Sequence, residues 1–154
     1  MFKVNKLTDY AMVVLIDIAC ADGRRSAHQV SDHTGLPLPT VAKLMKSLCR
    51  AGLVESQRGA TGGYSLGRAQ VEITVADVIQ AVEGPIALTA CADTSDEECG
   101  MENSCPVQGK WNRVNTAVRA ALSQVTLAEM VADVASFGMT VPLKSAPVRA
   151  GAQG

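Results

Sequence analysis

Aromatic residues are scarce in this sequence of 154 residues, where Phe, Trp and Tyr together make up 3 %. A hydrophobic core must therefore be built from aliphatic side chains. Long apolar runs are also missing: residues 11–16 form the longest one near the start, far short of the roughly 20 residues that a membrane-spanning helix needs. The length suits one compact domain, or two very small ones that share a core, and it excludes a large barrel.

Cysteine is too sparse for a disulfide scaffold, and the odd number of five cannot pair completely within one chain. The first six residues lead into an amphipathic helical pattern and do not have the form of a cleavable signal sequence. We therefore expect a cytoplasmic protein. In that compartment cysteines more often hold metal or carry out redox chemistry than form disulfides.

Basic side chains are absent between residues 71 and 105, a stretch that holds eight acidic residues. The total net charge of −1 argues at first against a nucleic-acid partner, because proteins that bind nucleic acids usually carry a basic excess. Residues 1–70, however, hold nine basic and five acidic side chains, and residues 106–154 hold five basic and two acidic ones. The total therefore conceals a basic front, an acidic middle and a mildly basic end.

Helical periodicity in residues 7–21 places apolar side chains on two faces, so we expect this helix to pack on both. Ser26 and Gln29 form a capping-box signature for a short helix that ends at Gly35. Pro39 then suits the first turn of a helix over residues 39–51.

The predicted helix over residues 39–51 has one apolar and one polar face. Its buried stripe comprises Val41, Leu44, Met45 and Leu48. Its exposed face carries Thr40, Lys43, Lys46, Ser47 and Arg50. A short helix, a turn with a glycine and a second helix with a basic face are typical of a helix-turn-helix.

Two short alternating segments, residues 53–56 and 64–66, flank a glycine-rich stretch and predict a β-hairpin. Directly behind a recognition helix such a hairpin is a wing, and Arg58 at its tip could reach a minor groove or phosphates. The basic helix face alone could be mere solvated surface, but the wing favours contact with DNA. The candidate DNA-binding residues are Thr40, Lys43, Lys46, Ser47, Arg50 and Arg58.

Capping residues and apolar spacing in the second half of the chain predict three more helices. Thr74 and Asp77 cap one over residues 75–83, and a long one from Lys110 is followed by a shorter one over residues 126–135. The long helix has an apolar seam of Trp111, Val114, Val118, Leu122 and Val125. So small a chain offers this seam little to pack on, so we expect self-association, with Trp111 as a core or dimer anchor.

The expected fold class is mainly α with a small β-hairpin wing. The expected divisions are a winged helix-turn-helix over residues 1–70, a connecting helix over 71–90, a cysteine loop over 91–105, dimerisation helices over 106–136 and a flexible tail over 137–154.

Three cysteines, Cys91, Cys99 and Cys105, fall within one acidic stretch of fifteen residues. Thiolates suit zinc or an iron-sulfur cluster, but this spacing is not the paired arrangement of zinc ribbons. Nearby carboxylates make thiol ionisation costly, so a bound cation would be needed to hold the thiolates together. The alternative is three incidental exposed cysteines. Cys20 and Cys49 lie among apolar residues and are expected to be small buried hydrophobes.

Several motifs together resemble the winged-helix iron-sulfur regulators of the IscR and NsrR type, over about residues 2–135. These are the segment 7–11 (LTDYA), the turn 35–40 (GLPLPT), the wing 58–66 (RGATGGYSL), the cysteine triplet and the helix that contains Trp111. Cys105-Pro, Trp111-Asn112, residues 115–117 and residues 125–130 look most like the branch that regulates the SUF cluster-assembly operon.

The resemblance implies a cytoplasmic homodimer with crossing long helices, a palindromic DNA operator, and a cluster in each cysteine loop that sets DNA affinity. Two departures affect the ligand set. Seven residues separate Cys91 from Cys99 where IscR-type members have five, and Gln108 replaces their histidine ligand. In nitric-oxide-sensing members an aspartate supplies the fourth ligand, and the matching residue is Asp9. The alternative role for Asp9 is that of an acid favoured by the helix dipole.

These observations lead to one main hypothesis and two alternatives. The main one is an iron-sulfur-dependent repressor of SUF-type genes that senses cluster status or redox stress, with a 2Fe-2S cluster favoured over 4Fe-4S. A zinc-binding or thiol-redox regulator is the first alternative. A small iron-sulfur carrier or scaffold is the second, but it leaves the wing and the basic helix face unexplained. The sequence has no nucleophile-base set or phosphate loop, so we expect no enzyme.

Overall fold

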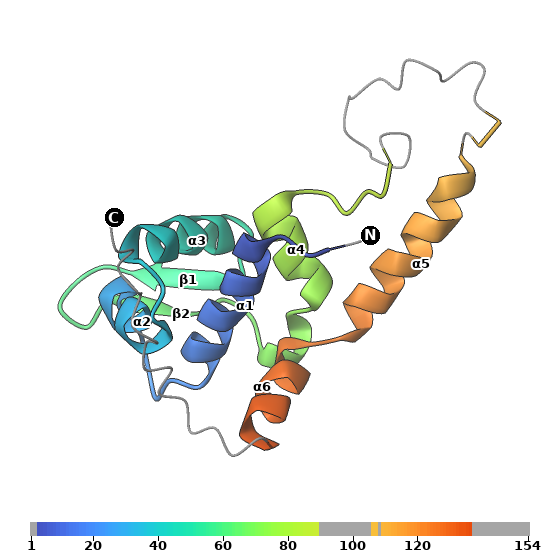
Figure 1. Cartoon of the computed structure of the whole chain (residues 1–154). Coiled ribbons are helices and arrows are strands. Elements are labelled where there is room, and N and C mark those ends of the chain that lie inside the picture. The colour runs from blue at the N-terminus through green and yellow to red at the C-terminus, as the bar shows by residue number, and fades with distance from the viewer. Residues whose placement is uncertain (1–2, 90–105, 108, 137–154) are drawn as a thin grey trace, which may run out of the picture.

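The computed structural model describes residues 3–89, 106–107 and 109–136. Along the chain the elements are α1 (Lys6–Ala19), α2 (Ala27–Thr34), α3 (Leu38–Arg50), β1 (Val54–Gln57), β2 (Gly63–Leu66), the 3-10 helix η1 (Gln70–Glu72), α4 (Val75–Glu83), α5 (Lys110–Gln124) and α6 (Leu127–Ser136). Helices α1, α2 and α3 and the hairpin form a unit that we call the head (Figure 1). Helix α5 stands on the far side of α4 from α3 and the hairpin, and α6 returns toward α1.

Helix α1 starts where Asn5 caps it, with the Asn5 side chain accepting a hydrogen bond from the Leu7 amide at 3.1 Å. One face of α1 is fully buried in the core through Ala11, Val14, Leu15 and Ile18. The second apolar face is only partly covered within the described structure, because Val13 and Ile16 are half-buried and Asp9 is exposed.

The two cysteines outside the cysteine triplet differ in exposure. Cys20 follows the last residue of α1 as its C-cap and is exposed, so the prediction that it is buried was wrong. The apolar spacing of the sequence continued past the point where the helix ends. Cys49 lies in the last turn of α3 and is partly buried.

Helices α2 and α3 confirm the predicted caps. The hydroxyl of Ser26 accepts from the Gln29 amide at 3.2 Å, and the Gln29 side chain accepts from the Ser26 amide at 2.8 Å. Gly35 ends α2 with a φ of 72°, a left-handed conformation that glycine adopts without steric cost. Helix α3 starts at Leu38, one residue before Pro39, which occupies its first turn.

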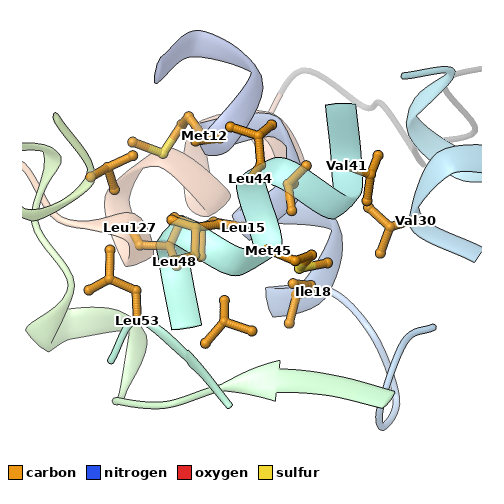
Figure 2. Close-up of a cluster of buried hydrophobic side chains, with 14 of the residues drawn as sticks. Met12, Leu15, Ile18, Val30, Val41, Leu44, Met45, Leu48, Leu53 and Leu127 are labelled. Atoms are coloured by element: carbon orange, nitrogen blue, oxygen red, sulfur yellow. The ribbon is translucent and has the colours of Figure 1, made fainter. Parts of the chain in front are cut away.

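The core is aliphatic, as the scarcity of aromatic residues predicted. Helix α3 buries the four predicted apolar side chains against α1, and Val30 of α2 and Leu53 before β1 complete the packing (Figure 2). Leu127 of α6 joins the same cluster, so the C-terminal helix is attached to the head. The largest fully buried side chains are Leu15, Leu44, Met45, Leu48, Leu53, Ile73 and Leu127.

Strands β1 and β2 pair as an antiparallel hairpin, with Val54 opposite Leu66 and Gln57 opposite Gly63. A third segment joins the hairpin, because Arg25 exchanges two backbone hydrogen bonds with Tyr64, at 2.9 Å and 2.7 Å. Gly63 has a φ of +136°, and a Cβ atom there would lie 2.9 Å from the Arg25 carbonyl oxygen. Only glycine fits this contact between the hairpin and the α1–α2 connection.

Helices α4 and α6 both begin with capping boxes. Thr74 and Asp77 cap α4, as predicted, and Thr126 and Glu129 exchange the same pair of bonds at α6. Hydrogen bonds from the backbone amide and then the hydroxyl of Thr126 lower the pKa of Glu129. Backbone bonds from Val75 to Val125 and from Leu127 to Ile73 join the two helix starts.

Helix α5 is the least covered element of the described structure. Of the predicted apolar seam, Trp111 is 40 % exposed and Val114 is 44 % exposed, whereas Leu122 packs against the cluster formed by Ala76, Ile79 and Ile86. Trp111 is therefore not a core residue of the single chain. No helix in the described ranges is long and apolar enough to span a membrane.

Substituting Leu48 with Ala should destabilise the protein strongly, since this side chain is fully buried in the aliphatic core. We expect a loss of about 2–5 kcal/mol in the free energy of unfolding, measured by urea denaturation. Val71→Ala, at a position that is 67 % exposed, is the control and should change this free energy by less than about 0.5 kcal/mol. Equal losses in the two variants would contradict the described core.

Candidate nucleic-acid interface

Helix α3 presents a cationic face on the side opposite its buried stripe. Lys43, Lys46 and Arg50 are exposed, and Thr40 and Ser47 on the same face are half-buried. None of the three cations forms an ion pair with another described residue. Their positive charge is therefore not neutralised within the described part of the chain, and it is available to an anionic partner.

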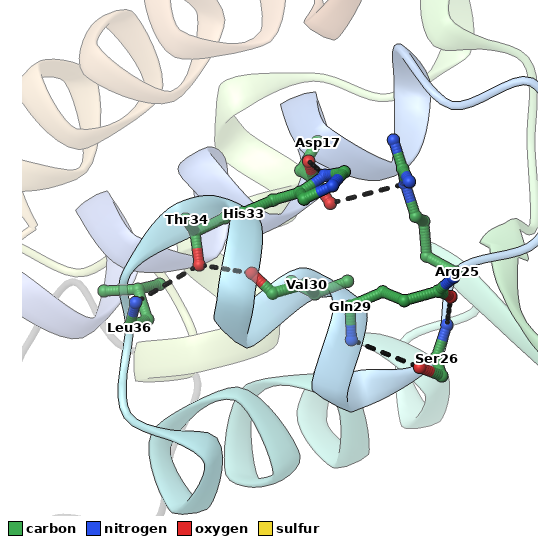
Figure 3. A network of polar contacts seen from close by, with 8 residues as sticks. All are labelled: Asp17, Arg25, Ser26, Gln29, Val30, His33, Thr34 and Leu36. Carbon is green, nitrogen blue, oxygen red and sulfur yellow. Dashed lines mark hydrogen bonds and ion pairs between the residues drawn. The ribbon is translucent and has the colours of Figure 1, made fainter. Parts of the chain in front are cut away.

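The turn between α2 and α3 is fixed by side-chain hydrogen bonds to its backbone. The Thr34 hydroxyl donates to the Val30 carbonyl at 2.6 Å and accepts from the Leu36 amide at 3.3 Å (Figure 3). The Ser31 hydroxyl donates to the Leu36 carbonyl at 2.7 Å. These bonds satisfy backbone groups at the end of α2 and hold the angle at which α3 leaves it.

Arg58 follows β1 directly and is exposed in the tip of the hairpin, where the sequence placed it. The base of the hairpin has a contact that sequence reasoning missed, because the Arg24 guanidinium donates to the Ser65 hydroxyl at 3.2 Å. No local sequence pattern signals this bond, since it joins residues 41 positions apart. The structure thus brings the α3 face and the hairpin together on one small unit, as the sequence predicted.

The predicted thiolate ligands Cys91, Cys99 and Cys105 lie outside the described residues, and so does Gln108. The described ranges hold no group of three or more His, Cys, Asp or Glu side chains that could bind a metal ion. Cys49 does not suit a ligand role, since burial raises the pKa of its thiol and favours the neutral form.

Asp9, the predicted fourth ligand, is exposed in the first turn of α1. Its neighbour Thr8 is only 4 % exposed and donates a hydrogen bond to the carboxylate of Glu83. The same Glu83 oxygen accepts from the Asn5 amide at 3.1 Å. The last residue of α4 thereby holds the first turn of α1, on which Asp9 stands.

The segment that leads toward the cysteines is attached to α5 by one buried side chain. Asn115 is 6 % exposed, accepts from the Leu88 amide at 3.2 Å and donates to the Ile86 carbonyl at 3.0 Å. These two bonds satisfy backbone groups of residues 86 and 88, which lie outside any helix or strand. The chain is therefore held to α5 at Ile86 and Leu88.

Comparison with known proteins identifies the family of this chain. Residues 4–133 match the sequence profile of the Rrf2 family, described as iron-dependent transcriptional regulators. The chain belongs to the Rrf2 family. The resemblance drawn from the sequence motifs is thus confirmed at the level of the family.

Curated Rrf2-type relatives include the HTH-type transcriptional regulator IscR of Photobacterium profundum. It is 32 % identical over 126 residues, which cover 80 % of this chain and 72 % of the relative. The IscR of Yersinia pseudotuberculosis is 33 % identical over 124 residues, or 79 % of this chain and 74 % of the relative.

Solved structures of two regulators have the same fold. IscR of T. potens aligns with a TM-score of 0.65 at 28 % identity, covering 90 % of this chain and 93 % of its own. CymR, the global cysteine regulator of B. subtilis, aligns with a TM-score of 0.65 at 29 % identity, covering 86 % and 98 %. The protein is therefore a DNA-binding winged-helix transcription regulator of mostly helical fold, and not an enzyme.

The two described cysteines should differ in reactivity toward iodoacetamide. Because burial raises the pKa of Cys49 while Cys20 is exposed, we expect Cys49 to react about tenfold more slowly in the native protein. Peptide mass spectrometry after timed quenching measures both rates. The difference should vanish in urea, which serves as the control, and equal rates in the native protein would contradict the described positions.

Proposed function

We propose that this Rrf2-family regulator is an iron-sulfur-cluster-dependent repressor that binds a palindromic operator as a homodimer. The observation that carries the proposal is the cationic face of α3, which has no ion pair among the described residues and lies beside the hairpin in the head. The hairpin then acts as the wing. The regulated genes are those of SUF-type cluster assembly and the protein works in the cytoplasm, both of which rest on the sequence resemblance.

Each candidate residue has a role that follows from its position on the head. Lys43, Lys46 and Arg50 would contact phosphates and base edges from α3, and Arg58 would reach a minor groove or phosphates from the wing. Thr40 and Ser47, which are half-buried at the edge of the same face, would hold the helix in register on the backbone.

Helix α5 supports the homodimer. It leaves large apolar side chains, among them Trp111 and Val114, open to solvent on an element that stands apart from the head. A second copy of the chain would cover this seam, and a two-fold dimer presents two heads to two half-sites. A palindromic operator follows from that symmetry.

The chemistry of the donor set fits a cluster. Three thiolates at Cys91, Cys99 and Cys105 are the ligand type that iron-sulfur clusters take, and the Asp9 carboxylate has no hydrogen-bond partner among the described residues. When bound, a cluster of the 2Fe-2S type, or of the alternative 4Fe-4S type, supplies sensitivity to iron supply and to oxidants. The zinc or thiol-redox regulator remains the alternative.

The described residues offer a route by which the cysteine-containing segment acts on the head. Glu83 joins the end of α4 to the first turn of α1, and Asn115 joins residues 86–88 to α5. A change in the cysteine-containing segment, which lies between Glu83 and Asn115 in the sequence, would therefore shift the first turn of α1 and helix α5. The five carboxylates of residues 91–105 would also repel DNA phosphates wherever they approach the duplex.

Removing a cation of the α3 face should weaken DNA binding and reduce its salt dependence. For Lys46→Ala we expect the slope of log K against log salt to fall by about 0.9, the value for one lost phosphate contact. Fluorescence anisotropy with a duplex selected from random DNA by the wild-type protein gives the slope. Lys110→Ala on α5 is the matched control, and an equal change in both variants would contradict the assignment of α3 as the DNA-binding element.

Anaerobic purification should yield a coloured protein with absorption bands of an iron-sulfur cluster in the visible range. The bands should disappear when Cys91, Cys99 and Cys105 are all replaced with Ser, and they should persist in the control Cys20→Ser, whose side chain is outside the triplet. A colourless protein that carries stoichiometric zinc would overturn the cluster proposal in favour of the alternative.

Asp9→Ala tests the fourth ligand: unchanged absorbance together with unchanged operator binding would remove Asp9 from the site.

A further inference from the structure

A buried carboxylate lies where α1, α2 and the wing meet. Asp17, in the last turn of α1, has a side chain that is 9 % exposed. Its Oδ2 atom lies 3.8 Å from Nε of Arg25, and its Oδ1 atom accepts a hydrogen bond from Nδ1 of His33 at 3.2 Å (Figure 3). Neither the proposed DNA contacts nor the proposed cluster uses this group.

The Arg25 side of the contact leads to the wing. Arg25 exchanges both backbone hydrogen bonds with Tyr64 of β2, and Gly63 allows the two backbones to approach. The neighbouring Arg24 bonds Ser65 of the same strand. Arg25 is therefore attached to β2 beside Gly63, the residue that lies opposite Gln57, and Gln57 directly precedes Arg58.

The His33 side leads to the helix-turn-helix. His33 lies in the last turn of α2, one residue before Thr34, whose hydroxyl holds the turn into α3. A single carboxylate on α1 thus contacts one residue that holds the wing and one residue beside the recognition turn. The two DNA-contacting parts of the head share this point of attachment.

Stability alone does not explain a charge in this place. Oδ2 of Asp17 and Nε of Arg25 are both buried and make no hydrogen bond within the described structure. Buried ion pairs with such incomplete hydrogen bonding often contribute no more stability than apolar side chains of similar size. The pair can instead determine how the wing is positioned relative to α1, because the two charges meet only when the wing lies close to the end of α1.

We propose that Asp17 is a positioning residue for DNA binding, which through Arg25 sets the wing at the distance from α3 that lets both engage one duplex. This rests on the proposed function in so far as it takes Arg58 as a DNA contact. Asp17 itself touches no DNA. Its role is to hold the wing where Arg58 can contact the duplex at the same time as the residues of α3.

The test is a thermodynamic cycle in the full chain with the double variant Asp17→Leu/Arg25→Met. This variant replaces both charges with apolar side chains, so it leaves no lone buried charge and does not alter the net charge of the head. Arg58→Ala should weaken operator binding by about tenfold in the wild-type background and by less than about twofold in the double variant, because a displaced wing no longer reaches DNA. Lys46→Ala should cost the same factor in both backgrounds.

A second measurement does not depend on DNA. Exchange of the Arg25 and Tyr64 amides, which bond each other's carbonyl oxygens, should be at least about tenfold faster in the double variant than in the wild type. If Arg58→Ala has no effect in the wild type, then the assigned DNA contact fails and amide exchange alone decides the role of Asp17. Unchanged amide protection, or an undiminished cost of Arg58→Ala in the double variant, would overturn the proposal.

Single substitutions separate position from charge. Asp17→Asn and Asp32→Asn each remove one acid, and Asp32 is exposed on α2. Loss of an acid near DNA strengthens binding through the electrostatic field, so charge alone predicts tighter binding in both variants. Positioning by Asp17 predicts weaker operator binding for Asp17→Asn only. Tighter binding in both variants would count against the proposal.

Discussion

Burial of the apolar stripe of α3 against α1 is the interaction on which the rest of the head depends. The stripe fixes the rotation of α3 about its own axis, and that rotation decides which side chains remain in solvent. Lys43, Lys46 and Arg50 face outward because Leu44 and Leu48 face inward. The candidate DNA-binding face of α3 is in this sense the complement of its buried stripe.

Local signals made most of the fold predictable. The capping boxes at Ser26 and Thr74, the glycine after α2 and the hairpin turn each involve residues within a few positions of one another, so sequence spacing alone reveals them. Helix ends were off by one or two residues, and Cys20 was placed inside a helix that had already ended. Periodicity cannot locate an end when the pattern continues past it.

Contacts between distant residues were not predictable. Asp17 meets Arg25 and His33 at separations of 8 and 16 positions, and Thr8 meets Glu83 at a separation of 75. Each of these groups looks like an ordinary surface residue until the fold brings its partner near. Helix α4 is the clearest case. Its sequence predicts only a capped helix, but in the structure it packs on α1, α3 and α5. It therefore connects the head to α5, the helix that stands apart. The candidate DNA-binding face, being one helix and one hairpin, came from local pattern, and the devices that hold it in place did not.

The pairing of Arg25 with Tyr64 has a consequence for the behaviour of the protein in a crowded cell. A two-stranded hairpin has two open edges, and each offers unpaired amides and carbonyls to strands of other molecules. The α1–α2 connection covers the β2 edge at Tyr64, and the short β1 edge is interrupted by the charge of Glu55. The hairpin can therefore remain exposed to solvent without serving as a template for edge-to-edge aggregation.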